Sequence, residues 1–165
     1  TEIQWAQNQF KYADLELMQR FFLNFWLDRN LANPQFEWLA YKKRVDFVHE
    51  KFGYGGVNGY NTERGRVFLK YGTPNTVQDI PFDGETYPHS IWQYNKLNGY
   101  TNQRFVFFTN TNGMLGYEII HSTLPGEPKN ENWHNSLSSK FVVPDNDRDA
   151  NSVHPNSLDI FNNPR

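Results

Sequence analysis

The chain has 165 residues and a net charge of −2 at pH 7, a length that one domain of ordinary size can fill. Aromatic residues make up 17% of it, so we expect a core built from large rings. The balanced charge leaves no basic stripe for phosphates, which argues against nucleic acid as the main partner. The absence of cysteine excludes disulfides, cysteine zinc sites and a thiol nucleophile. No apolar run reaches the roughly 20 residues that span a bilayer, so no transmembrane segment is expected.

Two helices are predicted at the start of the chain. Over residues 9–28, apolar side chains recur at helical spacing without Gly or Pro. Their arc is so wide that we expect this helix to be buried on more than one side or covered by a partner. A second helix is predicted from just after Asn33, a good N-cap followed by Pro34, to about Phe52. Because only a short loop separates the helices, they are expected to pack as an antiparallel hairpin.

Short strands are predicted after a glycine-rich loop over residues 53–65. Alternating or apolar runs indicate strands over residues 66–71, 90–94, 104–109 and 114–121. Residues 75–88 and 95–103 are interpreted as irregular or polar loops, and Asn112-Gly113 predicts the tight turn of a hairpin. The expected fold is therefore α+β, with the helical hairpin packed on a three- or four-stranded antiparallel sheet.

The pattern changes after Leu124. Residues 131–137 are compatible with one short helical turn, and the Pro- and Asn-rich residues that follow carry only brief apolar clusters. We interpret them as an irregular C-terminal arm that lies on a surface of this chain or of a neighbour. The sequence thus predicts one domain over residues 1–124 and an extended arm or linker over residues 125–165.

Several short motifs follow one another between residues 20 and 123. They are Phe25-Trp26-Leu27-Asp28-Arg29-Asn30, Phe52-Gly53, Gly59-Tyr60-Asn61-Thr62-Glu63-Arg64-Gly65-Arg66-Val67, Tyr71-Gly72-Thr73-Pro74, Ile91-Trp92-Gln93-Tyr94 and Phe105-Val106-Phe107. In order and spacing they resemble the GWxTD-domain family of bacterial, notably Bacteroidota, envelope-associated proteins. Tyr60 stands where the name motif has Trp, and Glu63 where it has Asp. The resemblance implies a place in the cell envelope, in the periplasm or at the outer membrane, but no defined reaction.

The polar loop between Asn58 and Arg66 has two interpretations. As a binding edge, it presents the Tyr60 ring, the Asn61 amide, and the guanidinium groups of Arg64 and Arg66 to a carboxylate. As a structural element, its glycines permit unusual backbone angles, its threonine caps a turn and its glutamate pairs with an arginine. We favour the structural interpretation, because glycine-bracketed polar loops usually meet a backbone requirement first.

No constellation in the sequence predicts a catalytic, cofactor or metal site. The acidic residues show no spacing that enforces the carboxylate pair of a glycosidase, and Glu118 and His121 would point to opposite faces of a strand. Exposed aromatics could stack on sugar rings, and the candidates are Trp5, Trp92, Trp133, Tyr54, Tyr60 and Tyr100. Trp133 is a candidate for a protein interface, because Trp is frequent at binding hot spots.

Two functions remain open from the sequence. The preferred one is a non-catalytic interaction or scaffold module of an envelope protein, with a protein partner and a place at the periphery of a membrane complex. The alternative is a domain that binds or hydrolyses carbohydrate or peptide in a cleft formed by Tyr60, Arg64, Trp92 and Tyr94. They differ in whether these side chains converge on one open pocket or divide between the core and the loop.

Overall fold

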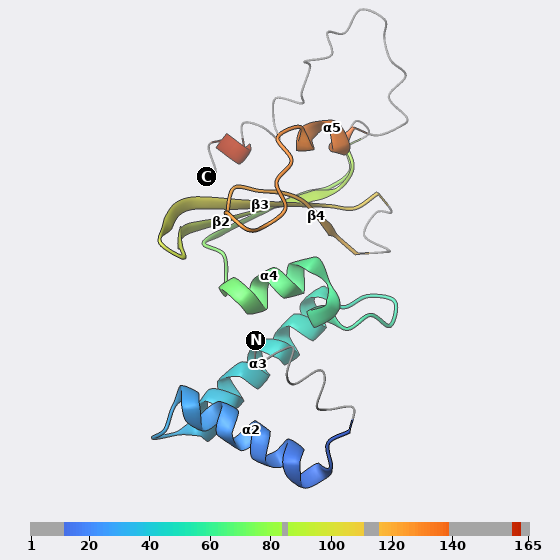
Figure 1. Ribbon diagram of the computed structural model, residues 1–165. Helices are drawn as coiled ribbons and strands as arrows, with labels where there is room; N and C mark the ends of the chain where they lie inside the picture. The colour runs from blue at the N-terminus through green and yellow to red at the C-terminus, as the bar shows by residue number, and fades with distance from the viewer. Residues whose placement is uncertain (1–11, 84–85, 111–115, 139–159, 163–165) are drawn as a thin grey trace, which may run out of the picture. The chain divides into compact units, whose positions relative to one another are not determined.

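The computed structural model describes residues 12–83, 86–110, 116–138 and 160–162 (Figure 1). The first three positions of the helix predicted over 9–28, the Asn112-Gly113 turn and most of the predicted C-terminal arm lie outside these residues. The chain divides into two compact units, Thr1–Asp46 and Phe47–Arg165. Helices followed by a four-stranded antiparallel sheet confirm the α+β class. The division into residues 1–124 and 125–165 stays a prediction.

The first unit contains helix α2 (Leu15–Arg29) and most of helix α3 (Pro34–Phe52). Asp14 caps α2 by accepting a hydrogen bond from the Leu17 amide at 2.8 Å. Asn33 caps α3 in the same way, with the Phe36 amide at 3.0 Å, so the predicted start of the second helix is confirmed. Rings of the two helices touch, with 5.7 Å between the centroids of Trp26 and Trp38. No described helix is long and apolar enough to cross a membrane, in agreement with the sequence.

The predicted strand over residues 66–71 is wrong, because these residues belong to helix α4 (Glu63–Tyr71). Helix α4 follows the short 3-10 helix η1 (Gly59–Asn61). The Thr62 hydroxyl accepts a hydrogen bond from the Gly65 amide at 3.1 Å, and Gly72, with φ of 84°, ends the helix. The pattern of apolar and polar side chains over residues 66–71 is compatible with the period of a strand and with that of a helix. The capping residues at both ends favour the helix.

The sheet consists of β1 (Thr76–Ile80), β2 (His89–Leu97), β3 (Tyr100–Phe108) and β4 (Glu118–Ser122), in the order β1-β2-β3-β4. Two predicted loops are therefore wrong. Strand β1 lies within residues 75–88, and β2 and β3 extend through residues 95–103 to a two-residue turn. That turn is Asn98-Gly99, whose φ angles of 50° and 84° suit the left-handed positions of a tight hairpin.

Both faces of the central strands are covered in the second unit. Trp92 pairs with Phe105 on the face that packs against α4 and the end of α3, where Val48, Val67 and Phe68 are buried. Ile91 pairs with Val106 on the opposite face, which packs against helix α5 (Trp133–Leu137). Figure 1 shows α4 and α5 on opposite sides of the sheet. The short helix predicted over residues 131–137 is confirmed, and it brings two residues from beyond Leu124, Trp133 and Leu137, into the core.

Candidate functional site

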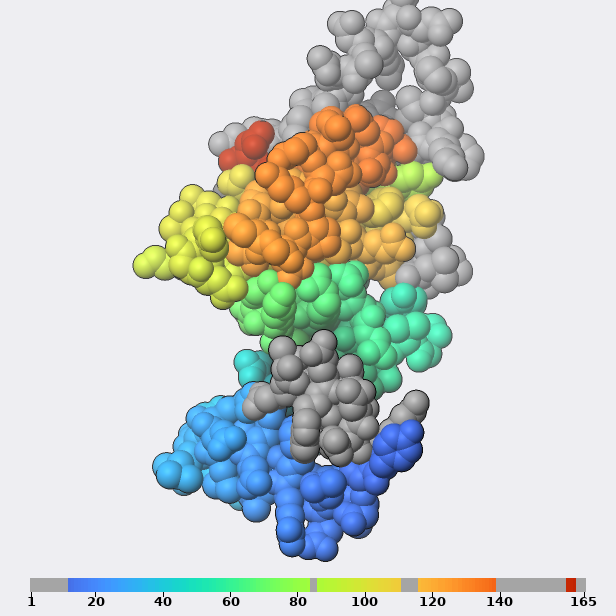
Figure 2. Space-filling model, viewed as in Figure 1, coloured from blue at the N-terminus to red at the C-terminus, as the bar shows by residue number. Residues whose placement is uncertain are grey.

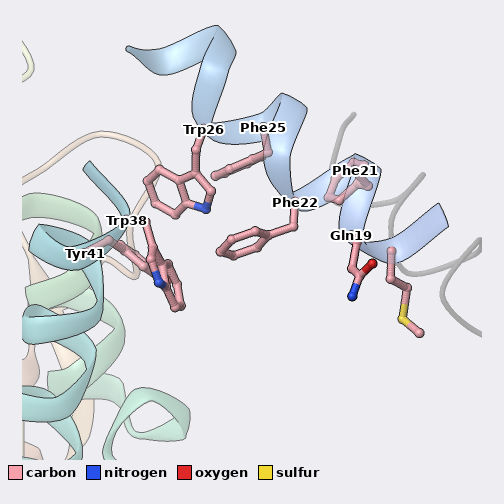
Figure 3. A pocket seen from close by; sticks show the side chains of 8 residues that line it. Gln19, Phe21, Phe22, Phe25, Trp26, Trp38 and Tyr41 are labelled. Carbon is pink, nitrogen blue, oxygen red and sulfur yellow. The ribbon is translucent and has the colours of Figure 1, made fainter. Parts of the chain in front are cut away.

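One candidate site is an apolar groove in the first unit, with a volume of about 550 Å³. Six rings line it, from Phe21, Phe22, Phe25, Trp26, Trp38 and Tyr41, together with Met18 and Gln19. We call these eight residues the aromatic groove. Figure 3 shows the rings of Trp26 and Phe22 projecting from α2 toward those of Trp38 and Tyr41 on α3. The centroids of Phe22 and Trp38 lie 4.9 Å apart in an edge-to-face arrangement that aromatic pairs favour.

Helix α2 buries little of its wide apolar arc. Trp26 is the only one of its fifteen residues that is buried, whereas Phe22 and Met18, which line the groove, are 44% and 36% exposed. A contiguous apolar surface of this kind is costly in water and typically marks a place where another molecule binds. The structure thus leaves open the second sequence-based expectation for this helix, that a partner covers it.

The Trp26 indole carries the polar atom that the groove leaves unsatisfied. The residue is only 8% exposed, and its Nε1 donor has no hydrogen-bond partner in the described structure. A buried Tyr or Trp usually finds an acceptor for its polar atom, and leaving that atom unpaired costs about 1–3 kcal/mol. Among the described residues, the Trp26 N–H is therefore an unsatisfied buried donor in the packing between α2 and α3.

The loop around the predicted motif is held by close packing against α3. A side chain at Gly59 would overlap the carbonyl oxygen of Val48, and one at Gly65 would overlap the carbonyl oxygen of Gly59. The Thr62 hydroxyl donates to the Gly59 carbonyl at 2.7 Å while it caps α4. These contacts support the structural interpretation, although the glycines serve close approach here and neither has a positive φ. Tyr60, 43% exposed, and Asn61 lie on the outer side of η1.

Arg66 takes part in an ionic cluster around the buried carboxylate of Glu127. Its guanidinium binds Glu127 in bidentate fashion, at 2.8 and 3.2 Å, and also binds Glu63. Glu127 accepts further hydrogen bonds from Lys70 at 2.7 Å and from the Tyr71 hydroxyl. We call these five residues the Glu127 cluster. It joins α4 to the segment after β4, and Figure 2 shows that orange segment lying against the green surface of α4.

The electrostatics of the Glu127 cluster favour the ionised carboxylate. Burial by itself would raise the pKa of Glu127, but the hydrogen bonds from Arg66, Lys70 and Tyr71 lower it to about 2. The same hydrogen bonds to Glu127 raise the pKa of Arg66 and of Lys70. With a side chain only 3% exposed, Glu127 offers no oxygen to a ligand, so the cluster holds the fold together.

The remaining predicted site residues divide between several places. Trp92, Tyr94 and Trp133 are each no more than 3% exposed; the Tyr94 hydroxyl donates to the Gly72 carbonyl at 2.9 Å. Arg64 lines a second cavity together with Trp92, while Tyr60 and Tyr94 are not among the residues that line it. Of the four side chains expected around one cleft, the structure therefore brings together two.

Sequence patterns did not single out Trp38, Val77 or Glu127, and Asp79 was considered only among the acidic residues of a possible glycosidase pair. Glu127 has partners that are 56 to 61 positions away in the chain, so no local pattern could reveal it. Val77 and Asp79 line the second cavity from β1, and the alternation in Thr76–Ile80 could have indicated that strand.

Within the described residues, no three His, Asp or Glu side chains lie close enough to hold a metal ion. No protein-family model matches the chain, and no similar curated protein or solved structure is found. The resemblance to the GWxTD-domain family stays a prediction from the motifs.

Proposed function

We propose that this chain is a non-catalytic interaction module, and that the aromatic groove is the surface that holds its protein partner. The observation that supports this most is the combination of six rings around about 550 Å³ of open groove with a helix whose apolar residues lie largely in water. A catalytic site needs converging polar groups, whereas aromatic and apolar side chains line this groove and none of its eight residues is charged.

The partner segment that fits this groove is an apolar helix. Two helices joined by a short loop form a trough, and a third helix can bury its apolar residues at positions i, i+3 and i+4 there. The exposed rings of the groove, Phe22 among them at 44% exposed, are suited to contact such apolar residues. The motif resemblance favours a bacterial envelope assembly for this interaction, so the envelope fraction is where we propose to look for the partner.

Substitution of an exposed ring within the groove is expected to separate binding from folding. Phe22→Ala should weaken the partner's affinity about tenfold or more, because aromatic side chains in the centre of an interface carry most of its energy. Leu23→Ala is the matched control, since Leu23 lies next along α2, is 54% exposed and does not line the groove. We expect it to change the affinity by less than about twofold.

The measurement begins with photo-crosslinking in the envelope fraction of the source organism. A photoreactive phenylalanine analogue at position 22 should give one stoichiometric product, and the same analogue at position 23 should not. The purified partner is then titrated with both alanine variants. Equal crosslinking from the two positions, or equal affinity of the two variants, would show that the groove is not the binding surface.

A further inference from the structure

The second unit contains a smaller cavity of about 180 Å³ beside Arg64, separate from the aromatic groove. Rings of Phe52, Phe68 and Trp92 form its floor and walls, and Val77 and Asp79 border it from β1. On β2 and β3 this face of the sheet is covered by α4 and the end of α3. Beside β1 the cover stops, so that Val77 is 47% exposed although it pairs with the buried Trp92. The cavity therefore lies where the helices cease to cover the sheet, beside β1.

Strand β1 is suited to receive a further strand. It is the outermost strand of the sheet and pairs with β2 alone among the described strands. An extended peptide can add to such an edge through main-chain hydrogen bonds. Because side chains alternate between faces, every second residue of that peptide would lie on the face of Val77 and Asp79, next to the cavity.

Arg64 gives the cavity a chemical preference. Its guanidinium carbon lies 3.8 Å from the centroid of the Tyr117 ring and 5.2 Å from that of Phe52. Its five N–H donors have no acceptor among the described residues, and burial lowers the pKa of the group. A guanidinium that is held between rings and partly removed from water without an acceptor is well placed to bind a carboxylate in bidentate fashion.

The other charged groups at the cavity are Lys51 and Asp79. Neither forms an ion pair with a described residue. Two cations against one carboxylate leave the site with one net positive charge, which matches a ligand with a single carboxylate. The rings beside Arg64 require that this carboxylate be accompanied by apolar side chains.

We propose that this cavity and the edge of β1 together bind an extended peptide segment of a protein partner, in which one acidic side chain stands between apolar ones on the same face. Arg64 binds the carboxylate, the rings of Phe52, Phe68 and Trp92 receive a neighbouring apolar side chain, and β1 supplies the main-chain hydrogen bonds. The site is independent of the aromatic groove and of the helix proposed to bind there.

The test is an NMR titration of the 15N-labelled full chain with an acetylated and amidated peptide of sequence Thr-Val-Thr-Glu-Thr-Val-Thr. Saturable shifts are expected for the amides of Thr76–Ile80. A peptide with Gln in place of Glu should bind about tenfold or more weakly, because it cannot form the charge-assisted hydrogen bonds. A peptide with alternate amides N-methylated should not bind, since it cannot pair with a strand.

Three variants assign the effect to the cavity. Arg64→Gln should remove the preference for the Glu peptide over the Gln peptide, a ratio measured within one variant and hence insensitive to a general loss of stability. Asp79→Asn should tighten binding of the Glu peptide about threefold, because a repelling charge is lost. Phe22→Ala, a substitution in the aromatic groove, should leave the affinity for the Glu peptide unchanged.

Several results would overturn the proposal. They are the absence of saturable shifts with the Glu peptide, shifts that spare β1, equal affinity for the Glu and Gln peptides, an unchanged preference in Arg64→Gln, and equal binding of the N-methylated peptide. Loss of peptide binding in Phe22→Ala would instead show that the groove and the cavity are not independent.

Discussion

Replacing Gly65 with alanine is expected to lower the free energy of unfolding by about 2–3 kcal/mol. Alanine is the better helix former by about 1 kcal/mol, and Gly65 lies within α4, so propensity alone predicts the opposite sign. Packing decides the outcome, because a methyl group there would overlap the carbonyl oxygen of Gly59 and press on a Val48 methyl at 2.8 Å. Backbone atoms on the crowded side cannot rotate away as a flexible side chain would.

Urea denaturation followed by tryptophan fluorescence measures this change. Gly59→Ala should have a similar effect, since its methyl group would overlap the Val48 carbonyl oxygen. Asn61→Ala is the control, because Asn61 is exposed in the same turn and its side chain forms no hydrogen bond with a described residue. If Gly65→Ala were as stable as the unmodified chain, then α4 would not approach η1 as closely as described.

Residues 59–72 show how much of the fold the sequence could predict. The glycines, the capping threonine and the Gly72 stop were all recognised as structural signals, yet residues 66–71 were assigned to a strand. Their alternation is genuine, but the polar residues of α4 are held by Glu127, which is distant in the sequence. The Asn98-Gly99 turn was overlooked beside Asn112-Gly113, although the two dipeptides carry the same local signal.

The candidate sites were harder to predict, because the type of a residue does not determine whether its side chain is buried or exposed. Trp92 and Trp133 are buried, while the rings of Phe22 and Tyr60 are more than 40% exposed. Only the packing of distant segments separates these cases. The helical periodicity of residues 9–28 was the informative signal, since an apolar arc wider than one contact face predicts either further burial or a partner.

The Glu127 cluster gives the second prediction with a large effect. Glu127→Gln should lower the free energy of unfolding at pH 7 by about 2–3 kcal/mol, because three donors lose the charge that they surround. The full 3–5 kcal/mol of a broken buried pair is not expected, since the side chains of Arg66 and Lys70 are 36% and 53% exposed and regain water. Glu131→Gln is the matched control, because Glu131 lies in the same segment and is 73% exposed. No measurable change is expected there.

The pH dependence of the unfolding free energy tests whether the charge of the Glu127 carboxylate is the source of this stabilisation. The pKa of Glu127 is about 2 in the folded chain and ordinarily 4.5, so its contribution is complete above pH 4.5 and is lost as the pH falls toward 2. The difference in unfolding free energy between the unmodified chain and Glu127→Gln should therefore be constant from pH 5 to pH 8 and shrink steadily below pH 4.5. Urea titrations at each pH measure it, and other carboxylates cancel in the difference. A difference that stayed constant down to pH 2 would assign the effect to the exchange of an acceptor oxygen for an amide donor, whereas a shrinking one establishes that the charge of Glu127 holds α4 to the segment after the sheet.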